Sequence, residues 1–238
     1  MNILEKAHVI HRSWRYRLRH EKDSIKYVLG LNLDGAIALD IGANKGIYTY
    51  WLSKKVGKDG KVIAFEPQPE LGEYLNDLKK SFGISNATII NKGLSYEIGS
   101  LDLYRGKVGS GGARIAVGQD DKIRNQGLQK VKVEVTTLDS FFENKNEKIK
   151  FIKCDVEGHE LSVFKGGEET LRKNSPIILF ECHHEEALSG ELFSFLTDLG
   201  YSGFFIQDGK EVDFREFAEF KYNSNDNHRN YIFKKDSL

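Results

Sequence analysis

The sequence predicts an α/β domain built around a doubly wound, mostly parallel sheet. Apolar segments at residues 37–41, 61–66 and 149–155 have the length of buried strands. Residues 70–82 have apolar side chains at helical spacing, and glycine-rich or acidic turns connect the two kinds of element. Strands that alternate with helices in this way are typical of a sheet covered by helices on both faces.

Length and composition limit the class of protein. The 238 residues suit one α/β domain, and 35 basic side chains balance 35 acidic ones. Sequence-independent binding to a nucleic-acid backbone requires an excess of basic side chains. This chain has no such excess, so we expect no nucleic-acid partner. No apolar run approaches the about 18 residues of a membrane-spanning helix, and the N-terminus lacks the apolar centre of a signal peptide. We therefore expect a cytoplasmic protein with no membrane span.

The first 35 residues predict a helical segment, and residues 36–238 the sheet domain. The segment could pack against the sheet, close over a ligand or pair two subunits into a homo-oligomer. Its basic run at residues 11–20 indicates a solvated helix face, with a phosphate or membrane surface as the alternative. Cys154 and Cys182 lie within apolar runs, so we expect buried free thiols.

The turn after the first strand predicts a ligand site. Asp40, Gly42 and Gly46 give the spacing D-x-G-x-x-x-G, and Ala43 and Asn44 lie within it. The glycines allow a ligand close to the backbone, and the following helix at residues 48–55 offers free N–H groups. A dinucleotide site has G-x-G-x-x-G instead, and the carboxylate of Asp40 would repel a diphosphate. S-adenosylmethionine, which carries an ammonium and a sulfonium, suits this turn. A purely structural turn is the alternative.

The second strand ends in Glu66, which Pro67 follows. An acid at this position of a doubly wound sheet can accept hydrogen bonds from both ribose hydroxyls of a nucleoside bound over the first turn. A helix-capping acid is the alternative. The third strand is expected at residues 87–93, so residues 91–94, including Gly93, should lie near the base.

Residues 100–138 predict an inserted, hairpin-like excursion. Alternating segments at residues 101–104 and 130–137 flank the glycine-rich residues 106–114. Such a loop could serve as a substrate lid or as a surface connection. Arg114 and Arg124 are cations there that could meet an anionic acceptor.

A polar turn follows the strand at residues 149–155. Asp155, Glu157, His159 and Glu160 crowd into it, and Gly158 allows the bend. Strand carboxyl ends border the ligand crevice of an α/β sheet, so these groups should face an acceptor beside the cofactor. His159 is the first choice of general base because its pKa lies near neutrality, and Asp155 is the second. Helix capping with a structural His159 is the alternative.

The rest of the chain predicts a helix at residues 161–173, a strand at 176–184, a helix at 191–199, strands at 203–207 and 230–234, and a loop at 221–229. The side chains of His159, His183, His184, Asp155 and Glu181 are of metal-binding types. Their spacing matches no compact metal motif, and we predict no metal site.

Three blocks, at residues 39–46, 64–67 and 152–167, together with residues 135–139 and 178–181, resemble the FkbM-type S-adenosylmethionine-dependent methyltransferases. The resemblance implies a class I methyltransferase fold, Rossmann-like, with a seven-stranded sheet of order 3-2-1-4-5-7-6 and strand 7 antiparallel. It also implies O-methylation of a hydroxyl on a small-molecule or glycan acceptor, such as a sugar or secondary metabolite.

The resemblance places the site residues by position. Cofactor binding is assigned to Asp40, Gly42, Ala43, Asn44, Gly46, Glu66, Pro67, Gly93 and Asp155. Catalysis is assigned to His159, Asp155 and Glu157. Two other functions use the same architecture. An NAD-dependent oxidoreductase is disfavoured by Asp40 and the glycine spacing, and a non-catalytic binding module by the polar turn after residue 154.

Overall fold

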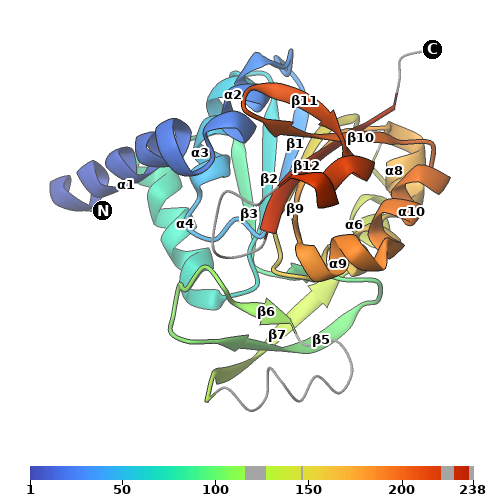
Figure 1. Cartoon of the computed structure of the whole chain (residues 1–238). Helices are drawn as coiled ribbons and strands as arrows, with labels where there is room; N and C mark the ends of the chain where they lie inside the picture. Colours follow the sequence, from blue (N-terminus) through green and yellow to red (C-terminus); the bar gives the residue numbers. More distant parts are fainter. Residues whose placement is uncertain (116–126, 146, 221–227, 236–238) are drawn as a thin grey trace.

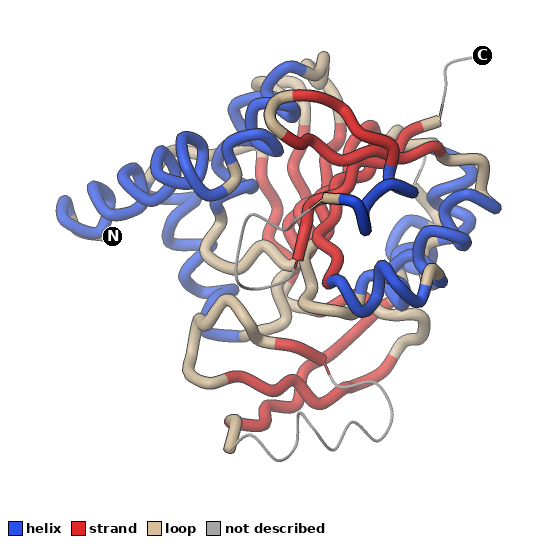
Figure 2. Tube along the Cα trace, viewed as in Figure 1, coloured by secondary structure: helices blue, strands red, loops and turns tan. Residues whose placement is uncertain are grey.

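One mixed sheet with helices on both faces forms the body of the protein (Figures 1 and 2). The computed structural model describes residues 1–115, 127–145, 147–220 and 228–235. The sheet strands are β1 (Ile37–Ile41), β2 (Lys61–Phe65), β3 (Ala87–Ile90), β8 (Ile149–Cys154), β9 (Ile177–His183), β10 (Ser202–Gln207), β11 (Lys210–Asp213) and β12 (His228–Lys234).

The strand order is β11-β10-β12-β9-β8-β1-β2-β3. β1 lies between β2 and β8 and is parallel to both, while β12 is antiparallel to β9 and β10. Without β11 this is the expected 3-2-1-4-5-7-6 order. The sheet has eight strands rather than seven because the chain turns at Asp208 and Gly209, both with positive φ, and returns along β10. The Asp-Gly pair is the sequence signal of that hairpin.

Successive residues of β1 point into two apolar cores, one on each face of the sheet. Leu39 and Ile41 belong to the core that includes Phe164 and Phe180, whereas Ala38 belongs to the core that includes Trp51. The alternation follows from the period of two in an extended strand. A sheet buried on both faces explains why these strands are almost continuously apolar.

Helices on one face come from the first third of the chain (Figure 1). They are α1 (Ile3–Arg15), a π-helical turn (Tyr16–His20), α2 (Lys22–Gly30), α3 (Ile47–Lys55) and α4 (Pro69–Ser81). The N-terminal helices pack on α3: the rings of Trp14 and Trp51 meet edge to face at 5.4 Å, and Trp51 Nε1 donates to the carbonyl of Ser13. Within the described ranges, no helix is both long enough and apolar enough to cross a bilayer.

The other face carries α6 (Leu138–Phe142), α7 (Glu160–Lys165), α8 (Glu168–Asn174), α9 (His184–Ser189) and α10 (Glu191–Asp198). The single helix expected at residues 161–173 is therefore two helices. The break falls at Gly166 and Gly167, where the chain packs closely on a neighbouring segment: a Cβ on Gly166 would lie 2.0 Å from the carbonyl oxygen of Ser95. The short α9 was not expected. Cys154 and Cys182 are buried free thiols, as predicted.

A second, smaller sheet of order β4-β7-β5-β6 lies below the main sheet in Figure 1. Its strands are β4 (Gly93–Leu94), β5 (Gly99–Arg105), β6 (Arg114–Ile115) and β7 (Gln129–Thr136). The third strand of the main sheet thus ends at Ile90 rather than at residue 93, because the chain crosses into this small sheet. Arg124 lies outside the described residues.

Arg105 connects the small sheet to the main one. Its side chain is 2% exposed, and its guanidinium donates to both carboxylate oxygens of Glu70 on α4 at 2.8 and 2.9 Å. It also donates to Oε1 of Gln68, the N-cap residue of α4, and to Oε1 of Gln129 on β7. Hydrogen bonds from Arg105 lower the pKa of Glu70 to about 2. Such a forked, charge-assisted contact fixes both distance and orientation.

Replacing Arg105 should loosen this connection. We expect Arg105→Ala to lower the free energy of unfolding by about 2–3 kcal/mol, since it removes buried hydrogen bonds to a charged partner. The exposed pair of Arg215 with Asp213 is a matched control, and Arg215→Ala should change stability by no more than about 0.5 kcal/mol. Urea unfolding of both variants measures the difference. Equal effects would show that Arg105 does not hold the two sheets together.

Candidate active site

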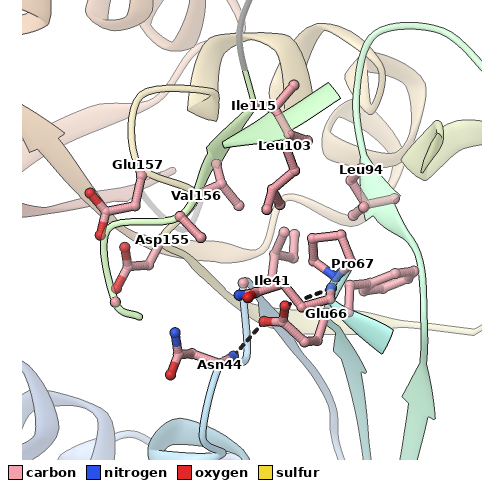
Figure 3. A pocket seen from close by; sticks show the side chains of 16 residues that line it. Ile41, Asn44, Glu66, Pro67, Leu94, Leu103, Ile115, Asp155, Val156 and Glu157 are labelled. Atoms are coloured by element: carbon pink, nitrogen blue, oxygen red, sulfur yellow. Dashed lines mark hydrogen bonds between the residues drawn. The ribbon is translucent and has the colours of Figure 1, made fainter. Parts of the chain in front are cut away.

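A pocket lies where the carboxyl ends of β1, β2 and β8 meet the small sheet (Figure 3). Gly42, Asn44, Glu66 and Pro67 line it from the main sheet, and Asp155, Val156 and Glu157 from the turn after β8. The small sheet and its loops contribute Gly93, Leu94, Leu103, Gly111, Ala113 and Ile115. In Figure 3 the carboxylates of Asp155 and Glu157 lie on one side and the apolar side chains of Leu94, Leu103 and Ile115 on the other.

Gly42 allows the strand ends to come this close. Its φ is +78°, and a Cβ there would lie 1.8 Å from the carbonyl oxygen of Asp155. Its N–H and that of Ala43 both donate to the carbonyl of Phe65 at 3.0 Å, and the N–H of Asp155 donates to Ile41. The turn therefore joins the ends of three strands through backbone contacts alone.

Glu66 lies at the floor of the pocket. One carboxylate oxygen accepts from the N–H of Asn44 at 2.8 Å, and the other accepts from the N–H of Gln68 at 2.9 Å. Asn44 makes its contact from a left-handed backbone with φ of +46°. Glu66 is only 3% exposed, and burial raises its pKa to about 7. The carboxylate thus retains acceptor capacity toward a ligand above it.

Three residues expected at the cofactor do not line the pocket. Asp40 is 2% exposed and turns toward α3, where the hydroxyl of Thr49 donates to it at 2.5 Å; burial raises its pKa to about 6. Ala43 packs with Ala64 and Leu75, and a Cβ on Gly46 would lie 2.8 Å from Leu75. These three support the turn from behind. Gly42, Asn44, Glu66, Pro67, Gly93 and Asp155 do line the pocket.

The turn after β8 is held by Glu160. Its buried carboxylate accepts from the N–H of Val156 at 2.8 Å and from that of Gly158 at 3.0 Å, and burial raises its pKa to about 8. Glu157 has φ of +56°, an uncommon conformation for a residue with a side chain. Such backbone strain clusters at functional sites. The turn presents Asp155 and Glu157 to the pocket.

His159, the expected first choice of base, lies behind the pocket rather than in it. It is 2% exposed, its Nε2 is 3.0 Å from Ser95 Oγ, and burial lowers its pKa to about 4. The residue is the N-cap of α7, and its ring lies inward, beside Ser95 and the chain segment next to Gly166. Its position favours the alternative of a structural histidine over the expected general base.

A buried charge network lies beneath Asp155. Lys153 is 1% exposed, and its Nζ is 3.6 Å from Asp155 and 3.4 Å from Asn230 Oδ1. Burial alone would lower the pKa of Lys153, but the negative charges of Asp155, Glu21 and Glu181 raise it. Glu21, from the N-terminal helical segment, accepts from Tyr48 and Asn230 at 3.0 and 2.8 Å.

The side chains considered for metal binding are brought together only in part. Within the described part of the chain, ligand atoms of Glu157, Glu181 and His183 lie within 4.8 Å of one another. His159 and His184 are not in this group. Burial and the negative charge of Asp155 raise the pKa of Glu181 to about 9, and a contact with Glu157 raises that of His183.

Sequence reasoning missed several residues of the site. Leu103 and Ile115 were not assigned, since nothing local distinguishes pocket-lining apolar residues from core residues, whereas Leu94 falls within the residues 91–94 expected near the base. Lys153 and Glu21 have a weak signal at most: Lys153 interrupts an apolar strand at a position that faces inward.

Comparison with known proteins identifies relatives of this arrangement. Residues 40–202 match the FkbM methyltransferase domain. The hexuronic acid methyltransferase AglP of Haloferax volcanii is 27% identical over 168 residues, covering 70% of this chain and 64% of that protein. The methyltransferase sdnD of Sordaria araneosa is 24% identical over 188 residues, covering 68% of this chain and 72% of that protein.

Solved structures agree with the fold. The crystal structure of an FkbM methyltransferase from Methylobacillus flagellatus superposes with a TM-score of 0.57 at 15% sequence identity. The superposition covers 86% of this chain and 45% of that chain. This chain therefore spans less than two thirds of the length of that protein and of the archaeal relative.

Gly42 should be far less tolerant of a side chain than other left-handed glycines. Gly83 has φ of +65° with open space around its Cβ position, so Gly83→Ala should cost only about 1–2 kcal/mol of conformational strain. Gly42→Ala adds a steric overlap with Asp155, and we expect a further loss of about 3 kcal/mol or more. Urea unfolding measures both. Similar losses would mean that close packing at Gly42 is unimportant.

Proposed function

This chain belongs to the FkbM methyltransferase family, and from that membership we propose that it transfers a methyl group from S-adenosylmethionine to an oxygen atom of a sugar, a glycan or a secondary metabolite. The observation that carries the proposal is one pocket with the carboxylate of Glu66 on its floor and those of Asp155 and Glu157 at its side. The carboxylate of Glu66 suits the ribose of a nucleoside, and those of Asp155 and Glu157 suit the hydroxyls of an acceptor.

The residues present fit S-adenosylmethionine. Gly42 and Gly93 line the pocket without side chains, and Glu66 can accept hydrogen bonds from ribose hydroxyls. Among the described lining residues there is no lysine or arginine, so the pocket suits a cationic ligand better than a diphosphate. When bound, the cofactor supplies a methyl group on a sulfonium leaving group. Leu94, Leu103 and Ile115 form an apolar wall for the adenine side.

Asp155 and Glu157 act on the acceptor in this proposal. A carboxylate at the edge of the pocket can orient a hydroxyl by accepting its hydrogen bond, and can take its proton as the oxygen attacks. Because the leaving group is already activated, alignment of the acceptor contributes much of the rate. The ion pair with Lys153 fixes the position of Asp155 from below.

The acceptor class rests on the relatives. One is named for a hexuronic acid, and a sugar or glycan offers the hydroxyls that the two carboxylates can orient. The fungal relative is named only as a methyltransferase, which leaves secondary metabolites within the proposal. The cation-free lining disfavours an NAD-dependent oxidoreductase. A non-catalytic binding module would have no use for Asp155 and Glu157 beside the cofactor.

Incubation with S-adenosylmethionine and a panel of hydroxylated sugars, uronic acids and metabolites tests the function. We expect S-adenosylhomocysteine to form with at least one acceptor. Asp155→Asn should lower turnover by about 10²–10⁴-fold, as expected for loss of general-base catalysis. His159→Asn, behind the pocket, should lower turnover less than about threefold once folded protein is compared. The reverse ranking would return the base role to His159.

Nucleoside binding should depend on the ionisation of Glu66. Burial raises its pKa to about 7, so the side chain is mostly protonated near pH 6 and mostly ionised near pH 8. The ionised form accepts stronger hydrogen bonds from ribose hydroxyls, so affinity should rise with pH by about tenfold across this window.

5′-Methylthioadenosine is the probe for calorimetry, because it lacks the titrating amino group of the cofactor. Glu66→Gln should bind more weakly and show no such pH dependence. A wild-type affinity that does not change between these pH values would mean that Glu66 does not bind the ribose.

A further inference from the structure

Ligand atoms of Glu157, Glu181 and His183 meet beside the acceptor end of the pocket, and His228 lies next to Glu181 and His183. Glu181 and His183 are two residues apart on β9, so their side chains share a face of the sheet. His228 on β12 lies directly opposite His183 in the antiparallel ladder, and the two rings are 5.8 Å apart. Glu157 reaches the group from the turn that follows the neighbouring strand β8.

Two distances within this group exceed those of hydrogen bonds and are close to the separation of two ligands on one ion. His183 Nε2 is 3.6 Å from Glu157 Oε2, and His228 Nδ1 is 3.5 Å from Glu181 Oε1. A hydrogen bond between such atoms would be no longer than about 3.2 Å. Two ligands of a tetrahedral metal ion with bonds of about 2.1 Å lie roughly 3.4 Å apart. His183 Nε2 is also a buried polar atom without a hydrogen-bond partner among the described residues.

The charge balance also favours a cation. Glu157, Glu181 and Asp155 crowd together, and Lys153, the buried cation beneath them, lies nearest to Asp155 at 3.6 Å. Glu181 is buried with only 10% of its side chain exposed, so water offsets little of this repulsion. The other three side chains are 20–30% exposed, and one of them, Glu157, lines the pocket.

We propose that Glu157, Glu181, His183 and His228 bind a divalent transition-metal ion, such as Zn²⁺ or Mn²⁺, at the acceptor end of the pocket. Imidazole and carboxylate together suit these ions, whereas Mg²⁺ and Ca²⁺ favour sites built from oxygen alone. This replaces the expectation from the sequence that the chain has no metal site.

The ion has a use that rests on the proposed methyl transfer. Glu157 belongs both to this cluster and to the pocket lining, so an ion there lies next to the acceptor. It would bind an acceptor through two neighbouring oxygens, such as vicinal hydroxyls or the hydroxyl and carboxylate of a uronic acid. It would also lower the pKa of the bound hydroxyl, whose proton then passes to Asp155 or to water as the oxygen attacks. Without a cation, the acids of this site would repel an anionic sugar.

Co²⁺ is the probe for the site, because its visible absorption reports ligand type and coordination geometry without any need for activity. Protein stripped with EDTA should take up Co²⁺ stoichiometrically and develop the absorption bands of a mixed nitrogen and oxygen site. Zn²⁺ should displace Co²⁺ and abolish the bands. Glu181→Gln and His183→Gln should each weaken Co²⁺ binding by at least tenfold.

His184→Gln and Glu185→Gln are the matched controls outside the cluster: His184 lies one position after His183, and Glu185 lies four positions after Glu181. Both should bind Co²⁺ as the wild type does. Circular dichroism of every variant shows whether it is folded. No Co²⁺ bands in the folded wild type, or equal binding by His183→Gln, would overturn the proposed site.

The role of the ion is tested separately. S-adenosylmethionine affinity should be the same within about twofold in stripped and Zn²⁺- or Mn²⁺-loaded protein, whereas methyl transfer to a sugar acceptor should require the ion. If the protein binds Co²⁺ but its methyl transfer is unchanged after stripping, the metal site stands and its role in methyl transfer is overturned. Co²⁺ binding in a protein that binds no S-adenosylmethionine would instead remove the proposed function and leave the metal site.

Discussion

The structure depends on the close approach of two backbones at Gly42. The carbonyl of Asp155 occupies the space where a side chain at residue 42 would begin. This contact fixes the end of β1 against the end of β8, and the N–H groups of Gly42 and Ala43 fix it against β2. The pocket lies where these three strand ends are joined. The same backbone contacts hold Glu66 and the turn with Asp155 and Glu157 near each other.

The site concentrates carboxylates in a poorly solvated place, and this has a consequence for what it binds. Burial raises the pKa values of Glu66, Glu160 and Glu181. Glu160 is compensated by two backbone N–H groups, and Glu66 by two others. Glu181 has no comparable set of donors among the described contacts. Positive charge from a ligand, either the sulfonium of the proposed cofactor or a metal ion, would relieve the repulsion that remains.

The parts of the site that the sequence predicts are local ones. Strand, glycine turn and helix follow each other within residues 37–55, so apolar period and turn chemistry were enough to predict Gly42 and Asn44, and the end of the second strand was enough to predict Glu66. Asp155 and Glu157 were predicted for the same reason. The FkbM resemblance added the strand order. The eighth strand was missed although Asp208-Gly209 is a recognised hairpin signal, because the flanking segments are short.

Other features depend on contacts that no local pattern contains. Asp40 and His159 have the right types in the right turns, yet Thr49 and Ser95 hold them away from the pocket. The direction of a side chain at a turn depends on packing from distant segments, and spacing does not encode it. The cluster of Glu157, Glu181, His183 and His228 combines three separate stretches of the chain. His228 lies opposite His183 only because of the register in which β12, the last strand, pairs with β9.

The N-terminal helical segment is coupled to the same end of the pocket. Glu21 accepts hydrogen bonds from Tyr48 on α3 and from Asn230 on β12, and Asn230 in turn contacts Lys153. One acid of the segment thus links the first helices, the last strand and the lysine beneath Asp155. Asn230 lies only two residues from His228 on β12. A shift of Glu21 would therefore displace Asn230 and change the surroundings of both Lys153 and His228. The helices before β1 therefore help to position the acceptor end of the pocket as well as covering one face of the sheet.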